Sequence, residues 1–219
     1  MDEEADPVDE LESVPAMLWP DVPRLGFGAG YERHLDADVE WGQRFGMFGY
    51  VEGYRRAAAA VFEAAANQNP DYSVWPLAFL WRHHLELAMK DIIAAGRQIE
   101  GQDGRFPKGH DLLKLWREAR PHIERCGPPD SPELRNVEAN IVEFQKIDPG
   151  GDGFRYPMKS DLRGRSLPDA PAHVNLATLH EAMEAVASFF SAVRTELGAR
   201  LDYISEARRE EALRDRDEY

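Results

Sequence analysis

Apolar side chains recur at intervals of three and four residues along most of the chain, and polar side chains fill the positions between them. The clearest case is the segment 75–95, whose apolar residues fall on one stripe of an α-helix. On another face of the same helix, Arg82, Glu86 and Lys90 follow one another at intervals of four. Ion pairs at this spacing stabilise a helix by roughly 0.2–0.5 kcal/mol each. This pattern predicts a core helix with a charged edge.

The same periodicity predicts four more helices, over about residues 44–67, 111–120, 131–148 and 175–204. Gly46, Gly49 and Gly53 in the first of these would permit another helix to approach closely. Pro121 disfavours helical geometry at the residue before it, so the helix that starts at Asp111 is expected to break or kink there. Strand-type alternation is almost absent. The sequence therefore predicts an all-α fold, an up-and-down bundle of about five helices with one long irregular loop.

Three segments depart from the helical pattern. Residues 1–40 are acidic and rich in proline and glycine, and we expect them to form an N-terminal arm. The segment 148–174 has no helical period, and a loop of that length inside a compact domain is usually functional or specifically anchored. Beyond residue 204 apolar side chains nearly vanish, which indicates a solvated helix end or a tail over 205–219. The bundle itself is thus assigned to residues 41–204.

Composition limits what the chain can do. Its 219 residues are 43% hydrophobic, enough to bury one substantial core. The net charge of -14 repels nucleic-acid backbones and anionic membranes, so a nucleic-acid function would need a local basic groove. No apolar run is long enough for a membrane span, and the first residues lack the plan of a signal peptide, so we expect a cytoplasmic protein. The single cysteine, Cys126, excludes an internal disulfide and a thiolate-rich zinc site.

Polar side chains that could bind a ligand or move a proton occur in three places. An arginine beside a histidine can hold a phosphate while the imidazole transfers a proton, a combination that suits phosphodiester chemistry. No His-Glu-x-x-His motif, cysteine pair or cluster of carboxylates at ligand spacing is present, so we expect no metal and no cofactor. The candidate groups are Arg82, His83 and Glu86 in the central helix, His110 and Asp111 at a helix start, and Asp148, Arg155 and Tyr156 around the long loop.

Each of these groups also has a purely structural interpretation. Arg82 and Glu86 would then belong to a solvated ladder of charges, which is the commoner role for such residues on a helix. For His110 a loop or capping role is the commoner one. Arg155 could form an ion pair with either Glu86 or Asp148 and so fix the loop to the bundle, because its planar fork suits a carboxylate.

Several phrases of the sequence resemble one known family. They are FLWRHHLELAMKDII, GHDLLKLW and IDPGGDGFRYP, followed by a terminal amphipathic helix. Over about residues 45–200 the chain resembles bacterial proteins with a HEPN-like domain, the higher-eukaryote and prokaryote nucleotide-binding helical fold. The resemblance implies a bundle of four or five helices that often dimerises. In active members it implies metal-independent RNA cleavage in toxin-antitoxin or phage-defence systems.

The catalytic pattern of that family is an arginine followed, after four to six residues, by a histidine. Arg82 is followed by the polar His83, but Leu87–Met89 occupies the places where the second histidine should stand. The pairs Arg105–His110 and Arg117–His122 meet the spacing, although the first lies in a predicted loop and the second contains a proline. The resemblance therefore also fits a catalytically inactive member that binds a nucleotide, a nucleic acid or a partner protein.

Two hypotheses follow for the function. In the first, the chain is a non-catalytic binding module that forms a homodimer and whose acidic surface favours a protein partner. In the second, it is a metal-independent endoribonuclease in which His110 or His83 moves protons and Arg82 or Arg155 binds the scissile phosphate. We favour the first, because the catalytic spacing is absent from the helix where it should stand and the net charge is wrong for RNA.

The two hypotheses differ in the surroundings that they require for Arg82. A basic surface groove that also contained Arg155, Arg163 and Arg165 would support the enzyme. A network between Arg82 and Glu86 that is closed off beneath the long loop would support a structural role.

Overall fold

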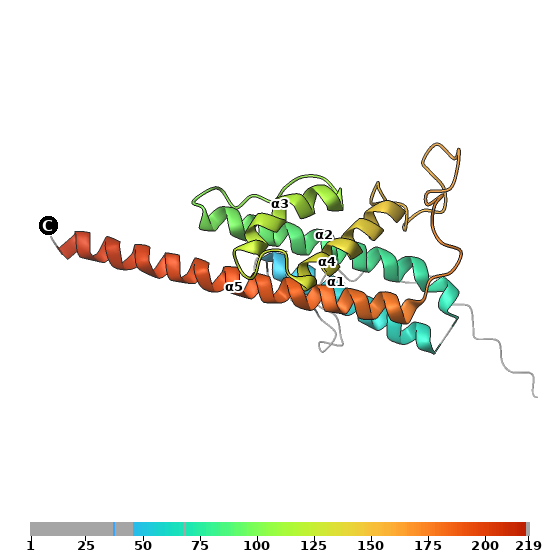
Figure 1. Cartoon of the computed structure of the whole chain (residues 1–219), viewed down its shortest axis with the longest axis horizontal. Helices are drawn as coiled ribbons and strands as arrows, with labels where there is room; N and C mark the ends of the chain where they lie inside the picture. The colour runs from blue at the N-terminus through green and yellow to red at the C-terminus, as the bar shows by residue number, and fades with distance from the viewer. Residues whose placement is uncertain (1–36, 38–45, 68, 218–219) are drawn as a thin grey trace, which may run out of the picture. The chain divides into compact units, whose positions relative to one another are not determined.

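A computed structural model describes residues 37, 46–67 and 69–217, and these residues form an all-α bundle (Figure 1). Its elements in chain order are α1 (Gly46–Ala66), the 3-10 helix η3 (Pro70–Tyr72), α2 (Val74–Ile99), α3 (Leu112–Glu124), α4 (Pro132–Ile147) and α5 (Leu176–Asp217). Within the described residues the one strand-like pairing is an antiparallel bridge between Met158 and Arg165 in the long loop. The predicted fold class and the five predicted helices are confirmed. The predicted arm over residues 1–40 lies outside the described residues apart from Ala37.

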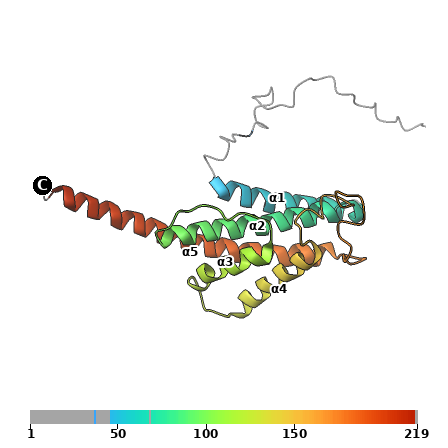
Figure 2. The ribbon, with the colours of Figure 1, turned by 90° about the horizontal axis from the view of Figure 1, so that it is seen from above.

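The helix α2 is the central element, since it contacts α1, α3 and α5. Figure 2 shows α1, α2 and α5 lying side by side, with α3 and α4 beside them. The apolar stripe of α2 faces these neighbours and is buried almost completely, at Leu77, Trp81, Leu85, Met89 and Ile92. Burying one such side chain stabilises the fold by roughly 1.5–3 kcal/mol. The core is therefore built around the stripe that the spacing predicts.

The helix α2 is longer than predicted, because it ends at Ile99 instead of Ala95. Gly96 lies inside this extension, and a Cβ atom added there would be 2.3 Å from the ring of His122 on α3. Only glycine permits so close an approach of the two helices. By contrast, a Cβ atom added at Gly46 or Gly53 would meet nothing within 4 Å, so the close approach predicted for the glycines of α1 is wrong at these two positions.

The helix α3 passes through Pro121 and ends at Glu124, so of the predicted break or kink at the proline the break is wrong. A proline in a helix removes one hydrogen bond and crowds the preceding turn. In α3 the residues two positions before and after the proline, Ala119 and Ile123, are both buried in the core. Packing against the core therefore outweighs the local preference of the sequence.

Two loops cover one side of α2. The loop between α2 and α3 runs back along α2. Arg97 of α2 donates a hydrogen bond to the carbonyl oxygen of Arg105 (2.7 Å), and Arg82 of α2 donates one to the carbonyl oxygen of His110 (2.9 Å). The loop between α4 and α5 begins at Asp148, whose side chain faces Arg82. Both loops thus meet α2 at Arg82.

The helix α5 is buried along one stripe as far as Leu197 and then changes character. Every described side chain from Ser205 to Arg214 is exposed, yet the helix continues to Asp217. Of the two predicted alternatives for this end, the structure shows the solvated helix. No helix among the described residues combines the length and the apolar character needed to cross a membrane.

Candidate functional site

Arg82 lies at the centre of the region that the sequence singles out, buried between α2 and the two loops. Its side chain is 2% exposed. Its Nε lies 3.3 Å from Oδ2 of Asp148 and its Nη1 lies 3.6 Å from Oε2 of Glu86, while Nη2 donates to the carbonyl oxygen of His110. Neither Nε nor Oδ2 of Asp148 makes a hydrogen bond within the described residues, so this contact is a charge attraction. Arg82 therefore joins three separate parts of the chain.

Asp148 closes the network from the loop side. It is 2% exposed, and its Oδ1 accepts hydrogen bonds from the backbone nitrogens of Gly151 (2.9 Å) and Gly153 (3.1 Å). Gly151 has a φ of +80°, and a Cβ atom there would lie 2.9 Å from the guanidinium of Arg82. The glycines of the phrase IDPGGDG therefore allow the loop to wrap around a buried carboxylate.

The charges in the network balance. Lys90 donates to Oε1 of Glu86 at 2.8 Å, so two cations face the two buried carboxylates of Glu86 and Asp148. Burial lowers the pKa of Arg82, against the attraction of Asp148 and Glu86. Burial alone would raise the pKa of Glu86, but hydrogen bonds from Lys90 and His110 hold it below its ordinary value. Arg82 and Glu86 are thus not a solvated ladder, and that structural interpretation is wrong for both.

His110 is the exposed end of this network. Its Nδ1 lies 2.9 Å from Oε1 of Glu86, while 67% of its side chain is exposed. A carboxylate only accepts hydrogen bonds, so Nδ1 must carry the proton, and Nε2 of the neutral ring is then a proton acceptor. The neighbouring Asp111 is occupied differently, since its Oδ1 accepts from the backbone nitrogen of Lys114 and caps α3. His110 is therefore an imidazole oriented by a buried carboxylate.

His83 lies beside this group but packs on aromatic rings. Its ring is half-buried, nearly perpendicular to that of Tyr54 (4.4 Å between centroids) and nearly parallel to that of Phe79 (5.8 Å). Burial lowers the pKa of His83, against the attraction of Glu86. His83 thus packs α2 against Tyr54 of α1.

Arg155 and Tyr156 lie on the surface of the long loop. The guanidinium of Arg155 lies 5.8 Å from the ring centre of Phe79 and 5.7 Å from that of Tyr156, distances typical of cation–π contacts. Within the described residues no carboxylate pairs with Arg155, so the predicted ion pair with Glu86 or Asp148 is wrong. Arg82 is the arginine that pairs with both carboxylates.

The other two spacing matches do not form a site. Arg117 is exposed, whereas His122 in the same helix is buried against Gly96, with its Nδ1 3.6 Å from Oε1 of Glu100. Arg105 pairs with Asp103 at 3.3 Å, and no contact among the described residues joins it to His110. Of all the candidates, Arg82, Glu86, His110 and Asp148 are the ones that direct contacts bring together.

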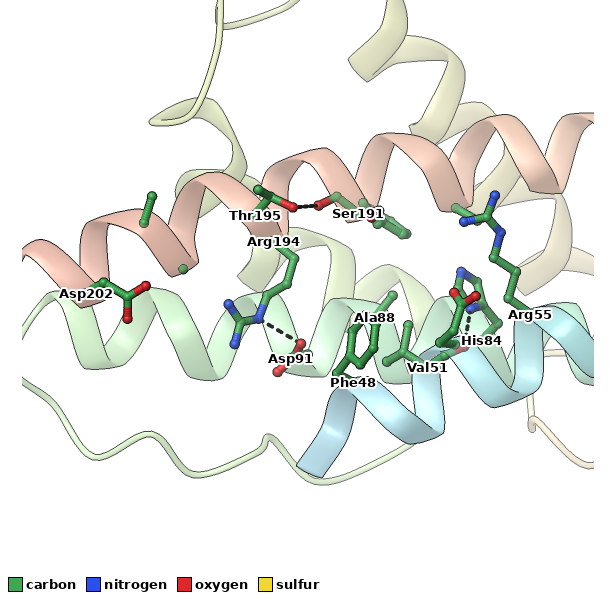
Figure 3. Close-up of a pocket in the computed structure, with 15 residues that line it drawn as sticks. Phe48, Val51, Arg55, His84, Ala88, Asp91, Ser191, Arg194, Thr195 and Asp202 are labelled. Atoms are coloured by element: carbon green, nitrogen blue, oxygen red, sulfur yellow. Dashed lines mark hydrogen bonds and ion pairs between the residues drawn. The ribbon is translucent and has the colours of Figure 1, made fainter. Parts of the chain in front are cut away.

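No motif in the sequence predicts a cavity of about 460 Å³ that lies between α1, α2 and α5 (Figure 3). Arg55 pairs with Glu184 at 2.6 Å and Arg194 pairs with Asp91 at 2.8 Å, so that two ion pairs link α5 to α1 and α2. The residues come from three helices that are far apart in the chain, which is why no local pattern predicts the cavity. Both arginines at its edge are neutralised by these partners.

His84 lies at the floor of this cavity and is 2% exposed. Its Nδ1 lies 3.0 Å from the carbonyl oxygen of Val51, and Figure 3 marks this contact. Because a carbonyl only accepts, Nδ1 carries the proton, and Nε2 has no hydrogen-bond partner within the described residues. Burial lowers the pKa of His84, against the hydrogen bond to Val51. It is therefore a neutral histidine of the core.

Among residues 46–67 and 69–217 there is no group of three or more His, Cys, Asp or Glu side chains placed to hold a metal ion. Comparisons of the chain with known protein families, with curated proteins and with solved structures found no match.

Proposed function

We propose that the chain is a non-catalytic binding module of the HEPN-like class and that its partner is a protein. The burial of Arg82 is the observation that favours this proposal over an enzyme, because its closed network with Glu86 supports a structural role for this arginine and not a catalytic one. A cation that binds a scissile phosphate must be reachable by the substrate and not already neutralised. Arg82, which the resemblance implies as the family's arginine, is 2% exposed and faces the carboxylates of Glu86 and Asp148.

Charge and surface composition favour a protein over RNA. The net charge of -14 opposes the approach of a polyanion as a whole. Trp75 and Tyr156 are 48% and 57% exposed, and Met158 nearby in the long loop is 40% exposed. Trp, Tyr, Met and Arg are the residue types enriched at protein interfaces. The proposal includes self-association, since the family resemblance implies a dimer.

Site-specific photo-cross-linking tests this proposal. A benzophenone amino acid replaces Tyr156, and in a control variant it replaces Tyr203, which is 74% exposed on α5. We expect protein adducts in source-cell extract from position 156 and fewer from position 203, and an adduct of twice the chain mass would identify self-association. Adducts with RNA alone, or equal adducts from both positions, would contradict the proposal.

A second candidate function is an endoribonuclease, and one observation favours it. His110 is exposed while its Nδ1 is held by the buried Glu86, which leaves Nε2 free to accept a proton. A histidine oriented in this way can act as a general base. Lys90 also binds Glu86, so a cation contacts the same carboxylate that holds His110.

RNA cleavage in EDTA distinguishes the two functions. Under the binding proposal neither the wild type nor any variant cuts RNA. Under the enzyme alternative the wild type cuts, and His110→Ala loses about 100-fold or more of the rate, since general acid–base groups contribute on the order of 10²–10⁴. His173→Ala is the matched control, because His173 is an exposed histidine of the long loop.

A further inference from the structure

The long loop forms a groove beside the start of α2, with a volume of about 700 Å³. Its lining is mostly apolar and aromatic. We call it the loop groove and define it by Trp75, Phe154, Arg155, Tyr156, Met158 and Arg165. The antiparallel bridge between Met158 and Arg165 pairs the backbones of two of these residues across the loop. The wall of the groove is therefore braced by one backbone pairing.

The loop groove differs in charge from the rest of the chain. Arg155 and Arg165 line it, and none of its lining residues is acidic, although the chain as a whole carries a net charge of -14. No carboxylate among the described residues forms an ion pair with either arginine. Arg155 is positioned by the rings of Phe79 and Tyr156, which orient its guanidinium without neutralising it. Two cations are thus available to a ligand.

A second cavity of about 360 Å³ adjoins the groove and shares Trp75, Phe154, Ala170 and Pro171 with it. Its further walls come from α4 and α5 and are mainly apolar, including Phe144. A cavity of this size is enough for one large apolar side chain. The two cavities together offer an apolar pocket next to a pair of arginines.

We infer that the loop groove binds a short acidic segment of a partner protein, with one aromatic or aliphatic side chain in the adjoining pocket and a nearby carboxylate on Arg155 and Arg165. This inference rests on the proposed function and names the class of partner. The net charge of -14 opposes the approach of a polyanion such as RNA, whereas a short segment brings only one or two negative charges. A segment with one or two carboxylates and an apolar anchor therefore fits the groove better than RNA does.

Selection from a random-peptide phage library on the full chain tests the inference. We expect enriched peptides to carry an acidic residue within about three positions of an aromatic or aliphatic one. Their binding, measured by fluorescence anisotropy, should weaken about tenfold or more in the double variant Arg155→Gln/Arg165→Gln, because hydrogen bonds to charged groups are the strong ones. Arg163→Gln is the control, since Arg163 is exposed in the same loop but does not line the groove.

A second variant tests the apolar pocket. Ala170→Trp places a large ring at the position that both cavities share, so peptides should bind it about tenfold or more weakly. The inference is overturned if no peptide is enriched, if the enriched peptides lack acidic residues, or if they bind the double variant as well as they bind Arg163→Gln. It is overturned in favour of RNA if labelled oligouridylate binds through these arginines and peptides do not.

The outcomes separate this inference from the proposed function. Protein adducts at position 156 together with failed peptide selection would leave the binding module in place and remove the acidic segment as its partner. RNA cleavage that depends on His110 would remove the proposed function, whatever the peptides do.

Discussion

Two regions of the molecule use arginine in opposite ways. Arg82 is buried, and its charge is matched by Glu86 and Asp148 within the protein. Arg155 and Arg165 are exposed in the loop groove, where no carboxylate among the described residues pairs with them. The first arrangement holds α2 and two loops together and leaves nothing for a ligand. The second leaves two cations that no described carboxylate neutralises.

The difference between them comes from their position in the chain and not from local sequence. Arg82 is fixed on a core helix, and the two loops fold over it because Asp148 and the carbonyl oxygen of His110 bind its guanidinium. Arg155 lies beyond the glycines that turn around Asp148, so the chain has already left the network there. A buried charge must be matched by the protein, whereas an exposed one need not be.

The largest effect that we expect comes from Arg82→Met. This change leaves Glu86 and Asp148 buried without their shared cation, and breaking a buried pair from one side typically costs about 3–5 kcal/mol. Urea denaturation at pH 7 measures the loss in the free energy of unfolding. Arg155→Met is the matched control, with an expected change within about 0.5 kcal/mol for an exposed side chain. Equal losses in the two variants would show that Arg82 does not join the loops to α2.

A smaller loss is expected from Gly151→Ala. Gly151 has a φ of +80°, and its added Cβ would lie 2.9 Å from the guanidinium of Arg82. A non-glycine residue in that conformation costs about 1–3 kcal/mol. The same denaturation experiment measures it, and Gly127→Ala is the control, because a Cβ there would meet nothing within 4 Å. If Gly151→Ala is as stable as the control, the loop does not hold its turn around Asp148.

The pH dependence of stability separates buried from exposed groups further. The pKa of Glu86 in the folded chain lies below its ordinary value of 4.5. A carboxyl group with a lowered pKa stabilises the fold above its unfolded pKa, and this contribution is lost as the pH falls through the folded pKa. We therefore expect the urea concentration at the unfolding midpoint to decrease as the pH is lowered below about 4.5. The decrease with pH should be less steep in Glu86→Gln. Equal slopes in the two proteins would contradict the role given to Glu86.

Protonation of the buried His84 should also lower the stability of the fold, but at a higher pH than protonation of Glu86 does. Burial lowers the pKa of His84 below 6.5, so the unfolded chain binds a proton more readily than the folded chain does. Stability should then decrease as the pH falls from 7 through 6.5, because folding opposes protonation. His84→Gln should show a smaller decrease over that range, measured by urea midpoints. His173→Gln, changed at an exposed position, should follow the wild type.

Much of the fold can be predicted from the sequence because helical periodicity is a local property. The periodicity predicts all five helices, and it predicts that one of them starts at Asp111, the residue that caps α3. The errors at Gly46, Gly53 and Pro121 share one cause, since each depends on what packs against the residue. Gly96 is the glycine that a neighbouring helix approaches closely, and nothing in its own surroundings in the sequence distinguishes it.

The candidate site can be predicted less completely. The spacing of Arg82 and Glu86 predicts that they can pair, but it does not reveal that loops cover them, because burial depends on contacts with Asp148 and His110 from distant segments. The length of the segment 148–174 does indicate a specific role. Its groove has no signal in the sequence, because the walls are completed by Trp75, which lies far away in the chain.

The smallest effect on stability is expected where the effect on binding is largest, in the double variant Arg155→Gln/Arg165→Gln. Both side chains are exposed and unpaired within the described residues, so the free energy of unfolding should change by no more than about 0.5 kcal/mol. Peptide binding should nevertheless weaken about tenfold or more, because the variant removes both cations of the loop groove. Urea denaturation and anisotropy on the same samples measure the two quantities.

A variant that loses stability and binding together would place these arginines in the fold, and the contrast with Arg82 would then disappear. A variant that keeps both would leave the groove without a part in binding, since a cation that meets a carboxylate of the partner cannot be removed without cost.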